Sequence, residues 1–111
     1  MAKHIKQFRY YAKGDDEKNS PAIITLAGLT SGKIFRDYTP IISLGIQSLP
    51  GTKFYLNDSA NPVIIGHSGL YELNLGDKMR IVSLAFDQTS IEAIENNPGG
   101  YLIIDIIYEG A

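Results

Sequence analysis

The segment 101–108, YLIIDIIY, places the strongest constraint on how this chain folds. Seven of its eight residues are aliphatic or aromatic, and Asp105 is its single charge. A short uninterrupted apolar run is typical of a strand in the middle of a sheet with both faces covered. The chain has 111 residues, which is enough for one domain with one core. We therefore expect this segment to form either the centre of a sheet or the centre of an interface.

The composition favours a folded, mainly β protein. Hydrophobic residues make up 44% and charged residues 20%, and the net charge is -2, which excludes a disordered or fibrous chain. Isoleucine, seven tyrosines and four phenylalanines suit the half-buried surface of a sheet, and eleven glycines and five prolines supply turns. We predict a small antiparallel β-sandwich, jelly-roll or Ig-like, with one short helix near 90–97. A partly open barrel is the alternative architecture.

Two absences narrow the environment of the protein. The chain has no cysteine, which excludes a disulfide scaffold, a thiolate metal site and thiol catalysis. No run approaches the roughly 18 apolar residues of a membrane helix, and residues 1–6 lack the apolar segment of a signal peptide. We therefore expect a soluble protein that is made in a cytoplasm and has no membrane contact.

Turn signals divide the chain into an arm and one domain. Residues 3–13 predict an edge strand or an arm, and the polar loop 14–21 follows it. We expect residues 1–20 to be an N-terminal arm with an exposed loop, and residues 21–111 to be a single sandwich domain. Strands are predicted over residues 22–27, 41–49, 53–57, 63–66, 69–75, 79–86 and 101–108, with a glycine-rich loop at 28–33.

Particular residues mark the ends of these elements. Pro40 indicates the start of a strand or an edge, and Pro50 with Gly51 predicts a type II turn. Thr89 followed three residues later by Glu92 predicts a capping box at the start of the helix.

Alternation predicts which side chains face the core. In 69–75 the inward set is Tyr71, Leu73 and Leu75. In 79–86, Ile81, Ser83 and Ala85 are predicted on one face, with Arg80, Val82, Leu84 and Phe86 on the other.

Charge is unevenly distributed along the chain. Residues 1–53 carry eight Lys and Arg against four Asp and Glu, whereas residues 54–111 carry two against eight. If the two halves form different surfaces, copies of the chain would meet through opposite potentials. The alternative is that antiparallel strands mix the halves and remove the asymmetry.

Residues 27–34 approach the phosphate-binding loop pattern but do not satisfy it. Ala27 stands where the pattern needs glycine, and Ile34 stands where it needs serine or threonine. We therefore predict a glycine-rich turn between strands and no nucleotide cofactor.

The residues that suggest catalysis or metal binding also lack the required pattern. His67 and Ser68 are adjacent and so point to opposite faces, and Leu70 stands where a nucleophile elbow needs glycine. His4 lies in the N-terminal segment, and residues 15–17 lack the spaced ligands of a calcium loop. We predict no catalytic residue, no cofactor and no metal, and therefore not an enzyme.

Basic and aromatic residues are interleaved near the N-terminus, a pattern that also occurs in single-stranded nucleic-acid binding. The isoelectric point of about 5.6 argues against nucleic acid as the partner. We favour an arm that packs on another subunit, and we predict as its contact residues Lys3, Lys6, Phe8, Arg9, Tyr10 and Tyr11.

Three stretches carry a family resemblance. Residues 44–75, LGIQSLPGTKFYLNDSANPVIIGHSGLYELNL, are followed by IVSLAFD and by the final GGYLIIDIIYE. Together they resemble a module of virion proteins in tailed phages that infect Gram-positive bacteria. The resemblance implies a small β-sandwich with a structural or attachment role in the head, neck or tail, and it transfers no catalytic residue.

These observations favour assembly over catalysis. We predict a non-enzymatic virion structural protein, such as a capsid decoration, neck or tail component, located in the virion after synthesis in the bacterial cytoplasm. Its expected partners are other virion proteins and further copies of itself. The core or interface strand is expected to use Leu102, Ile103, Ile104, Ile106, Ile107 and Tyr108.

Two other functions stay open at this point. A carbohydrate-binding or host-attachment module of a phage tail would use Tyr55, Asn57, Asn61 and Tyr71 as a stacking and hydrogen-bonding site for a saccharide. A nucleic-acid-binding protein is the third and less favoured function.

Overall fold

The computed structural model describes residues 2–11, 25–74 and 80–110. Its strands are β1 (Ala2–Tyr11), β2 (Ile41–Ser48), β3 (Lys53–Leu56), β4 (Val63–Ile64), β5 (Leu70–Asn74), β6 (Leu84–Phe86) and β7 (Tyr101–Gly110). Its helices are α1 (Leu26–Ser31), the 3-10 helix η2 (Lys33–Tyr38) and α2 (Gln88–Asn96). The predicted loop 14–21, the acidic residues 15–17, the start of the predicted strand 22–27 and Leu75 lie outside the described residues.

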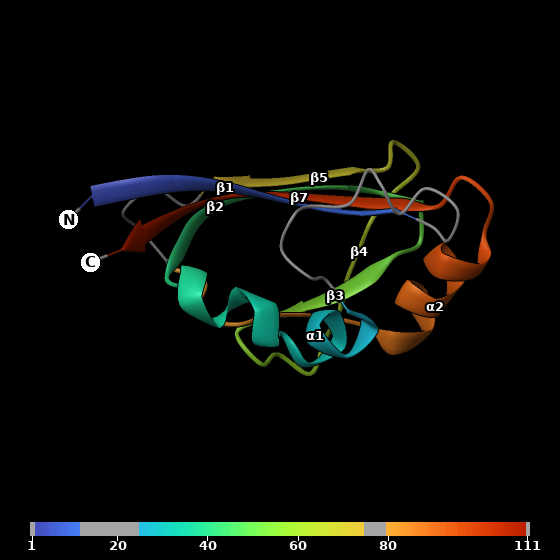
Figure 1. Cartoon of the computed structure of the whole chain (residues 1–111), viewed down its shortest axis with the longest axis horizontal. Coiled ribbons are helices and arrows are strands. Elements are labelled where there is room, and N and C mark those ends of the chain that lie inside the picture. Colours follow the sequence, from blue (N-terminus) through green and yellow to red (C-terminus); the bar gives the residue numbers. More distant parts are fainter. Residues whose placement is uncertain (1, 12–24, 75–79, 111) are drawn as a thin grey trace.

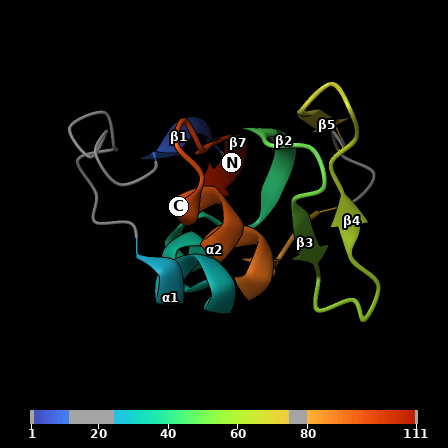
Figure 2. The same cartoon turned by 90° about the vertical axis from the view of Figure 1, so that its right-hand side faces the viewer.

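The strands form two antiparallel sheets, in the orders β1-β7-β2-β5 and β4-β3-β6. In Figure 1 the larger sheet lies above, and β3 and the helices lie below it. Figure 2 shows the helices beneath the β1 side of the larger sheet and the β3-β4 hairpin beneath its β5 side. The predicted mainly β fold, a small antiparallel sandwich with a short helix, is therefore confirmed.

Strand β7 is a central strand of the larger sheet, as predicted, because it pairs with β1 on one side and with β2 on the other. Its residues Leu102, Ile104 and Ile106 point into the core and are at most 1% exposed. The residues between them are half-buried on the opposite face. The prediction that both faces are covered is wrong for the described residues, because the second layer lies on one side of the sheet only.

The predicted type II turn at Pro50 and Gly51 is confirmed. Thr52 N donates to Leu49 O at 3.2 Å and Gly51 has a φ of 91°, the geometry of a type II turn. After β3, Asn57 and Asp58 take positive φ values of 53° and 57° and lead into the antiparallel strand β4. These turns fix the smaller sheet beneath the larger one.

Strand β5 shows the predicted alternation. Tyr71 and Leu73 are half-buried, whereas Leu70, Glu72 and Asn74 are exposed. The strand therefore has one face toward the core and one face toward the outside.

Helix α1 stands where the sequence predicts the end of a strand and a glycine-rich loop. The Oγ1 atom of Thr25 accepts a hydrogen bond from Gly28 N at 2.9 Å and caps α1, which buries Leu29 completely. Gly32 ends the helix with a φ of 74°, and a Cβ there would collide with the carbonyl oxygen of Leu84. The predicted strand over 26–27 and loop over 28–33 are wrong, because the cap and the core contact outweigh the strand propensity of the preceding Ile-Ile-Thr run.

Helix α2 begins earlier than predicted. Its N-cap is Asp87, whose Oδ2 atom accepts from Ser90 N at 3.1 Å, and Thr89 lies inside the first turn. Asp87 is held at this position because its own N–H donates to Lys53 O at 3.0 Å. The predicted capping box at Thr89 is therefore wrong, although the helix itself is confirmed.

The predicted strand over 79–86 is interrupted. Ile81 and Leu84 are both buried, whereas Val82 is 62% exposed, so the predicted two-residue alternation is wrong. The backbone N–H groups of Val82 and Ser83 donate to Asn57 Oδ1, which takes them out of a regular ladder. Only the last three residues form β6.

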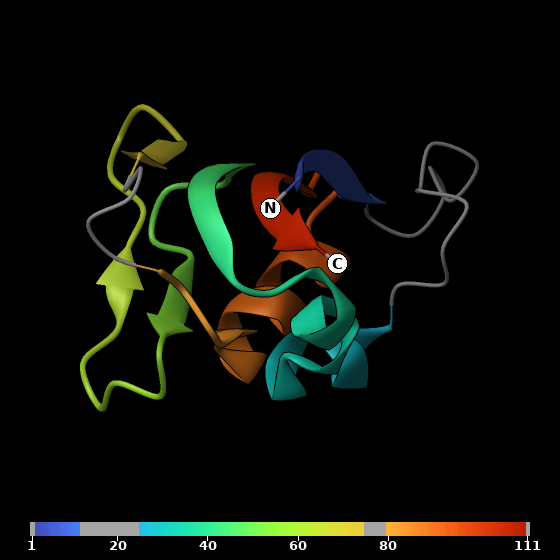
Figure 3. The same ribbon diagram turned by 90° about the vertical axis from the view of Figure 1, so that its left-hand side faces the viewer.

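Strand β1 is the edge strand of the larger sheet, which is one of the two forms predicted for this segment. It pairs with β7 from Ala2 to Tyr11, and Figure 3 shows the two strands side by side. Phe8 is 2% exposed and meets the rings of Phe35 and Tyr38 edge-on, each at a centroid distance of 5.3 Å. The pairing also places the basic start of the chain beside its acidic end.

Candidate functional site

One face of the larger sheet is not covered by any described element (Figure 1). Its residues occupy alternate positions of four neighbouring strands, as the register of the pairs requires. We call this set the outer face, and it consists of Lys3, Ile5, Gln7 and Arg9 on β1, Ile103, Asp105, Ile107 and Glu109 on β7, Ser43, Gly45 and Gln47 on β2, and Leu70, Glu72 and Asn74 on β5.

The outer face carries apolar side chains at both of its edges. Ile5 on β1 is 81% exposed and Leu70 on β5 is 43% exposed. Ile107 lies opposite Ile5 in the register and, like Ile103, is half-buried. Because exposed aliphatic area is costly in water, such a surface indicates contact with another molecule.

A polar band crosses the middle of the outer face. Gln7 Nε2 donates to Asp105 Oδ1 at 2.7 Å. In the same row across the sheet, Gly45 on β2 lies beside Asp105 and Glu72 on β5 lies beside Gly45. Since Gly45 has no side chain, the surface is hollowed between β2 and β5, and the hollow has a volume of about 240 Å³. The face thus has a projecting isoleucine near one edge and a hollow near the other.

An ion pair fixes one end of the outer face. Arg80 Nε donates to Glu109 Oε1, and the Glu109 side chain is only 10% exposed. The hydrogen bond from Arg80 lowers the pKa of Glu109 from its ordinary value, because it stabilises the carboxylate form. This contact ties the end of β7 to the segment that precedes β6.

The predicted assembly arm is divided between the two faces of β1. Lys3 and Arg9 lie on the outer face, and the Lys6 ammonium lies over the rings of Phe8 and Tyr38 at 5.8 and 5.7 Å. Phe8 and Tyr10 are buried in this chain's own core, where another molecule cannot reach them. Tyr11 ends the strand and is half-buried.

The predicted core or interface strand is divided in the same way. Leu102, Ile104 and Ile106 are in the core, and Ile103 and Ile107 are on the outer face. The remaining member, Tyr108, lies with its ring 5.2 Å from His4 and 5.2 Å from Tyr38.

The residues predicted to bind a saccharide do not meet at one surface. The Asn57 amide is occupied, because Oδ1 accepts from Val82 N at 2.7 Å and Nδ2 donates to Arg80 O at 3.2 Å. Tyr71 points inward and packs against Phe54 at a centroid distance of 5.1 Å. Tyr55 is next to Phe54 in β3 and therefore points away from Tyr71, and Asn61 is exposed in the following turn.

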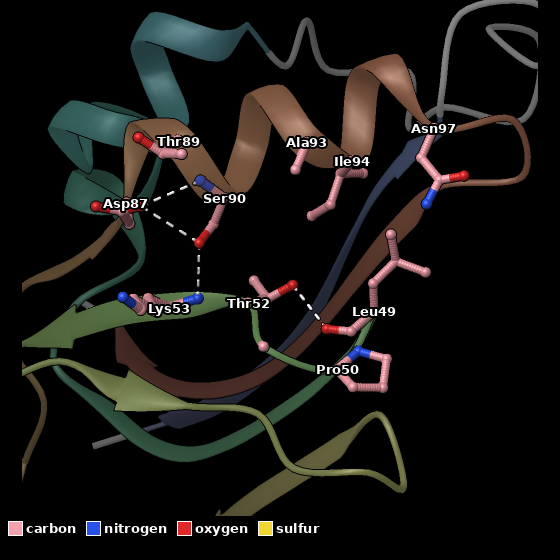
Figure 4. A pocket seen from close by; sticks show the side chains of 11 residues that line it. Leu49, Pro50, Thr52, Lys53, Asp87, Thr89, Ser90, Ala93, Ile94 and Asn97 are labelled. Carbon is pink, nitrogen blue, oxygen red and sulfur yellow. Dashed lines mark hydrogen bonds between the residues drawn. The ribbon is translucent and has the colours of Figure 1, made fainter.

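A pocket of about 720 Å³ lies between the turn after β2 and helix α2 (Figure 4). Leu49, Pro50 and Ile94 form part of its apolar wall. Figure 4 shows the polar side of the pocket, where Ser90 Oγ accepts from Lys53 N at 3.0 Å and is 3.3 Å from a carboxylate oxygen of Asp87. These bonds attach α2 to β3, so the hydroxyl and the carboxylate have structural partners.

The two histidines lie on separate elements, and among the described residues neither makes a hydrogen bond to Ser90. A serine nucleophile needs an adjacent base, but Ser90 has its carboxylate contact with the N-cap Asp87. His4 stacks on Tyr108 at the end of β7, and His67 is exposed in the turn before β5. Ser68, beside His67, has its hydroxyl 3.5 Å from Leu70 O.

Within residues 2–11, 25–74 and 80–110, no three His, Asp or Glu residues are grouped closely enough to hold a metal ion. The helices in the same part of the chain are too short or too polar to cross a membrane.

Several outer-face residues were not singled out by the sequence. Side chains alternate between the two faces of β1, so Ile5 lies on the face that Phe8 does not occupy once the strand is recognised. Gly45 interrupts an otherwise apolar strand, and a glycine in that position signals a close approach or a gap in the surface. Glu72 joins them only through the strand order, which no local pattern reveals.

Comparison with family models, with curated proteins and with solved structures finds no match to this chain.

Proposed function

We propose that this chain is a non-enzymatic structural protein of a virion that works by contacts with other proteins through its outer face. The observation that carries the proposal is the uncovered face itself, on which Ile5 is 81% exposed and Leu70 is 43% exposed. The resemblance of residues 44–75 and of the final strand to virion proteins of tailed phages supports the setting. The protein would act as a capsid decoration, neck or tail component, with other virion proteins as partners.

Covering the outer face removes apolar surface from water, which lowers the free energy of the complex. Burial of apolar surface stabilises a complex by about 25 cal/mol per Å², whereas an exposed ion pair contributes about 1 kcal/mol or less. Two exposed and two half-buried aliphatic side chains on one flat face therefore favour a protein partner over a small charged ligand. A twisted sheet surface also suits another sheet, which packs on it at about 10 Å.

The polar groups of the pocket support the same function. Asp87 and Ser90 hold α2 against β3, and the Lys53 backbone takes part in that contact. Groups engaged in this way stabilise the fold and are poorly placed to activate a substrate.

The proposal is tested in particles purified from the source culture. Mass spectrometry of the washed particles should detect this chain at a fixed ratio to the other structural proteins. Its absence from particles that contain the remaining components would overturn the proposal. Turnover of a small molecule by the purified chain, lost on mutation of one residue without loss of folding, would overturn the non-enzymatic part.

A further inference from the structure

We infer that the outer face packs against the outer face of a second copy of this chain, with Ile5 of each copy seated over Asn74 of the other, at the β5 side of the hollow between β2 and β5. The inference rests on the proposed function and names one partner for it. It has three supports in the structure: the position of a projection and a hollow, the distribution of charge, and the area of the face.

The strand order makes the face complementary to itself. A two-fold axis that runs parallel to the strands reverses the order of the facing sheet, so that β1 of one copy lies over β5 of the other and β7 lies over β2. Stacked sheets whose strands are nearly aligned are a common packing arrangement. The arrangement brings each edge of the face onto the opposite edge of its partner.

Shape is the first support for this arrangement. Ile5 is the most exposed large hydrophobic side chain of the described residues, and it lies on β1. The hollow of about 240 Å³ lies between β2 and β5, with Gly45, Ser43 and Asn74 among its walls. The strand pairing aligns Ile5, Ile107, Ser43 and Asn74 in one row across the four strands. The axis keeps each row in place and lays β1 over β5, so Ile5 of one copy lies over Asn74, at the hollow of the second copy.

Charge is the second support. The β1 edge of the face carries Lys3 and Arg9, whereas the β5 edge carries Glu72. The proposed axis lays the basic edge of each copy over the acidic edge of the other, which favours this orientation. Asp105, near the centre, keeps the hydrogen bond from Gln7 at 2.7 Å when the face is covered.

Area is the third support. Four strands spaced about 4.8 Å apart, with on average some eight residues of about 3.4 Å, give a face of about 500 Å² in projection. The accessible surface of a pleated face exceeds its projection, and a standard interface takes about 800 Å² from each partner. The face therefore approaches the area of a standard interface.

The free edge of β1 is a less favourable route to the same partner. Two β1 strands paired side by side would bring together two copies of Lys3, Lys6 and Arg9 with no acidic residue of β1 to offset them. Like charges on an edge strand oppose such pairing. The face is therefore the better surface for a second copy.

Cysteine cross-linking tests the geometry directly, because the natural chain has no cysteine. One chain carries Ile5→Cys and a differently tagged chain carries Asn74→Cys, at an exposed position of β5 in the same row as Ile5. We expect a disulfide between the two chains after mixing under mild oxidation. The two positions lie on opposite edge strands of one sheet, roughly 14 Å apart, which is beyond disulfide reach within one chain.

A matched pair of variants tests the energetics by sedimentation equilibrium. Ile5→Asp should weaken self-association at least about tenfold, because two isoleucines leave the interface. Val82→Asp, at a residue 62% exposed outside the outer face, should leave it unchanged. Equal effects of the two variants, or disulfides only between Ile5→Cys chains, would overturn the inference. A chain that stays monomeric yet occurs in particles would overturn this inference alone and leave the proposed function standing.

Discussion

Asn57 shows how a single side chain can join two parts of the fold. It has a positive φ of 53°, and its amide makes hydrogen bonds to Val82 N, Ser83 N and Arg80 O. Asparagine tolerates this backbone conformation better than most residues. The partners of Asn57 are more than twenty residues away along the chain and cannot be read from local pattern.

We expect Asn57→Ala to lower the free energy of unfolding by about 2 kcal/mol, because the backbone groups of Arg80, Val82 and Ser83 lose their hydrogen bonds and the left-handed backbone is strained. The control is Asn61→Ala in the same turn, where the side chain is exposed and the expected change is within about 0.5 kcal/mol. Urea denaturation of both variants measures the difference. Equal stability of the two, with loss of saccharide binding in Asn57→Ala only, would restore the carbohydrate-binding function.

The ion pair of Arg80 with Glu109 predicts a pH dependence of stability. Arg80 lowers the pKa of Glu109, so the stabilisation is present above the ordinary pKa of about 4.3 and is lost as the pH falls through the lowered value. The melting temperature of Glu109→Gln should therefore lie below that of the natural chain at pH 7, and the gap should close in acid. Adding Arg80→Gln should cause little further loss. A gap that is constant with pH would contradict the assignment.

At the scale of the elements, α2 depends on its cap. Asp87 accepts from Ser90 N, whereas Thr89 lies inside the helix and is exposed. Asp87→Ala should cost about 1 kcal/mol of stability, and Thr89→Ala should cost much less. Chemical denaturation distinguishes them, and the reverse order would show that Thr89 is the cap.

Strand β7 has two faces with different tasks, and neighbouring residues separate them. Ile104 is 1% exposed in the core, so Ile104→Asp should prevent folding because it buries an unpaired charge. Ile103 lies on the outer face, so Ile103→Asp should fold with an unchanged circular dichroism spectrum and weaken self-association. A folded Ile104→Asp, or an unfolded Ile103→Asp, would contradict the orientation of the strand.

The elements also show what the sequence can and cannot predict. Alternation and turn chemistry were sufficient for β2, β5, β7 and the turn at Gly51, since their local pattern agrees with their burial. Helix α1 was missed because six residues after an Ile-Ile-Thr run look like the end of a strand. Of the outer face, the apolar residues of β7 could be predicted, but their neighbours depend on the order of the strands.

At the scale of the whole molecule, the described second layer of strands and helices lies on one face of the larger sheet (Figure 1). No element within residues 2–11, 25–74 and 80–110 covers the other face. The central claim of the proposed function is that a partner protein covers this face.

Sedimentation equilibrium of the natural chain, from micromolar to millimolar concentration, tests most directly whether a second copy of the chain is this partner. We predict that the mass rises with concentration from 12.2 kDa towards that of a dimer, and that added salt weakens the association through the charged edges. A mass of 12.2 kDa at every concentration would contradict the prediction of a self-complementary outer face.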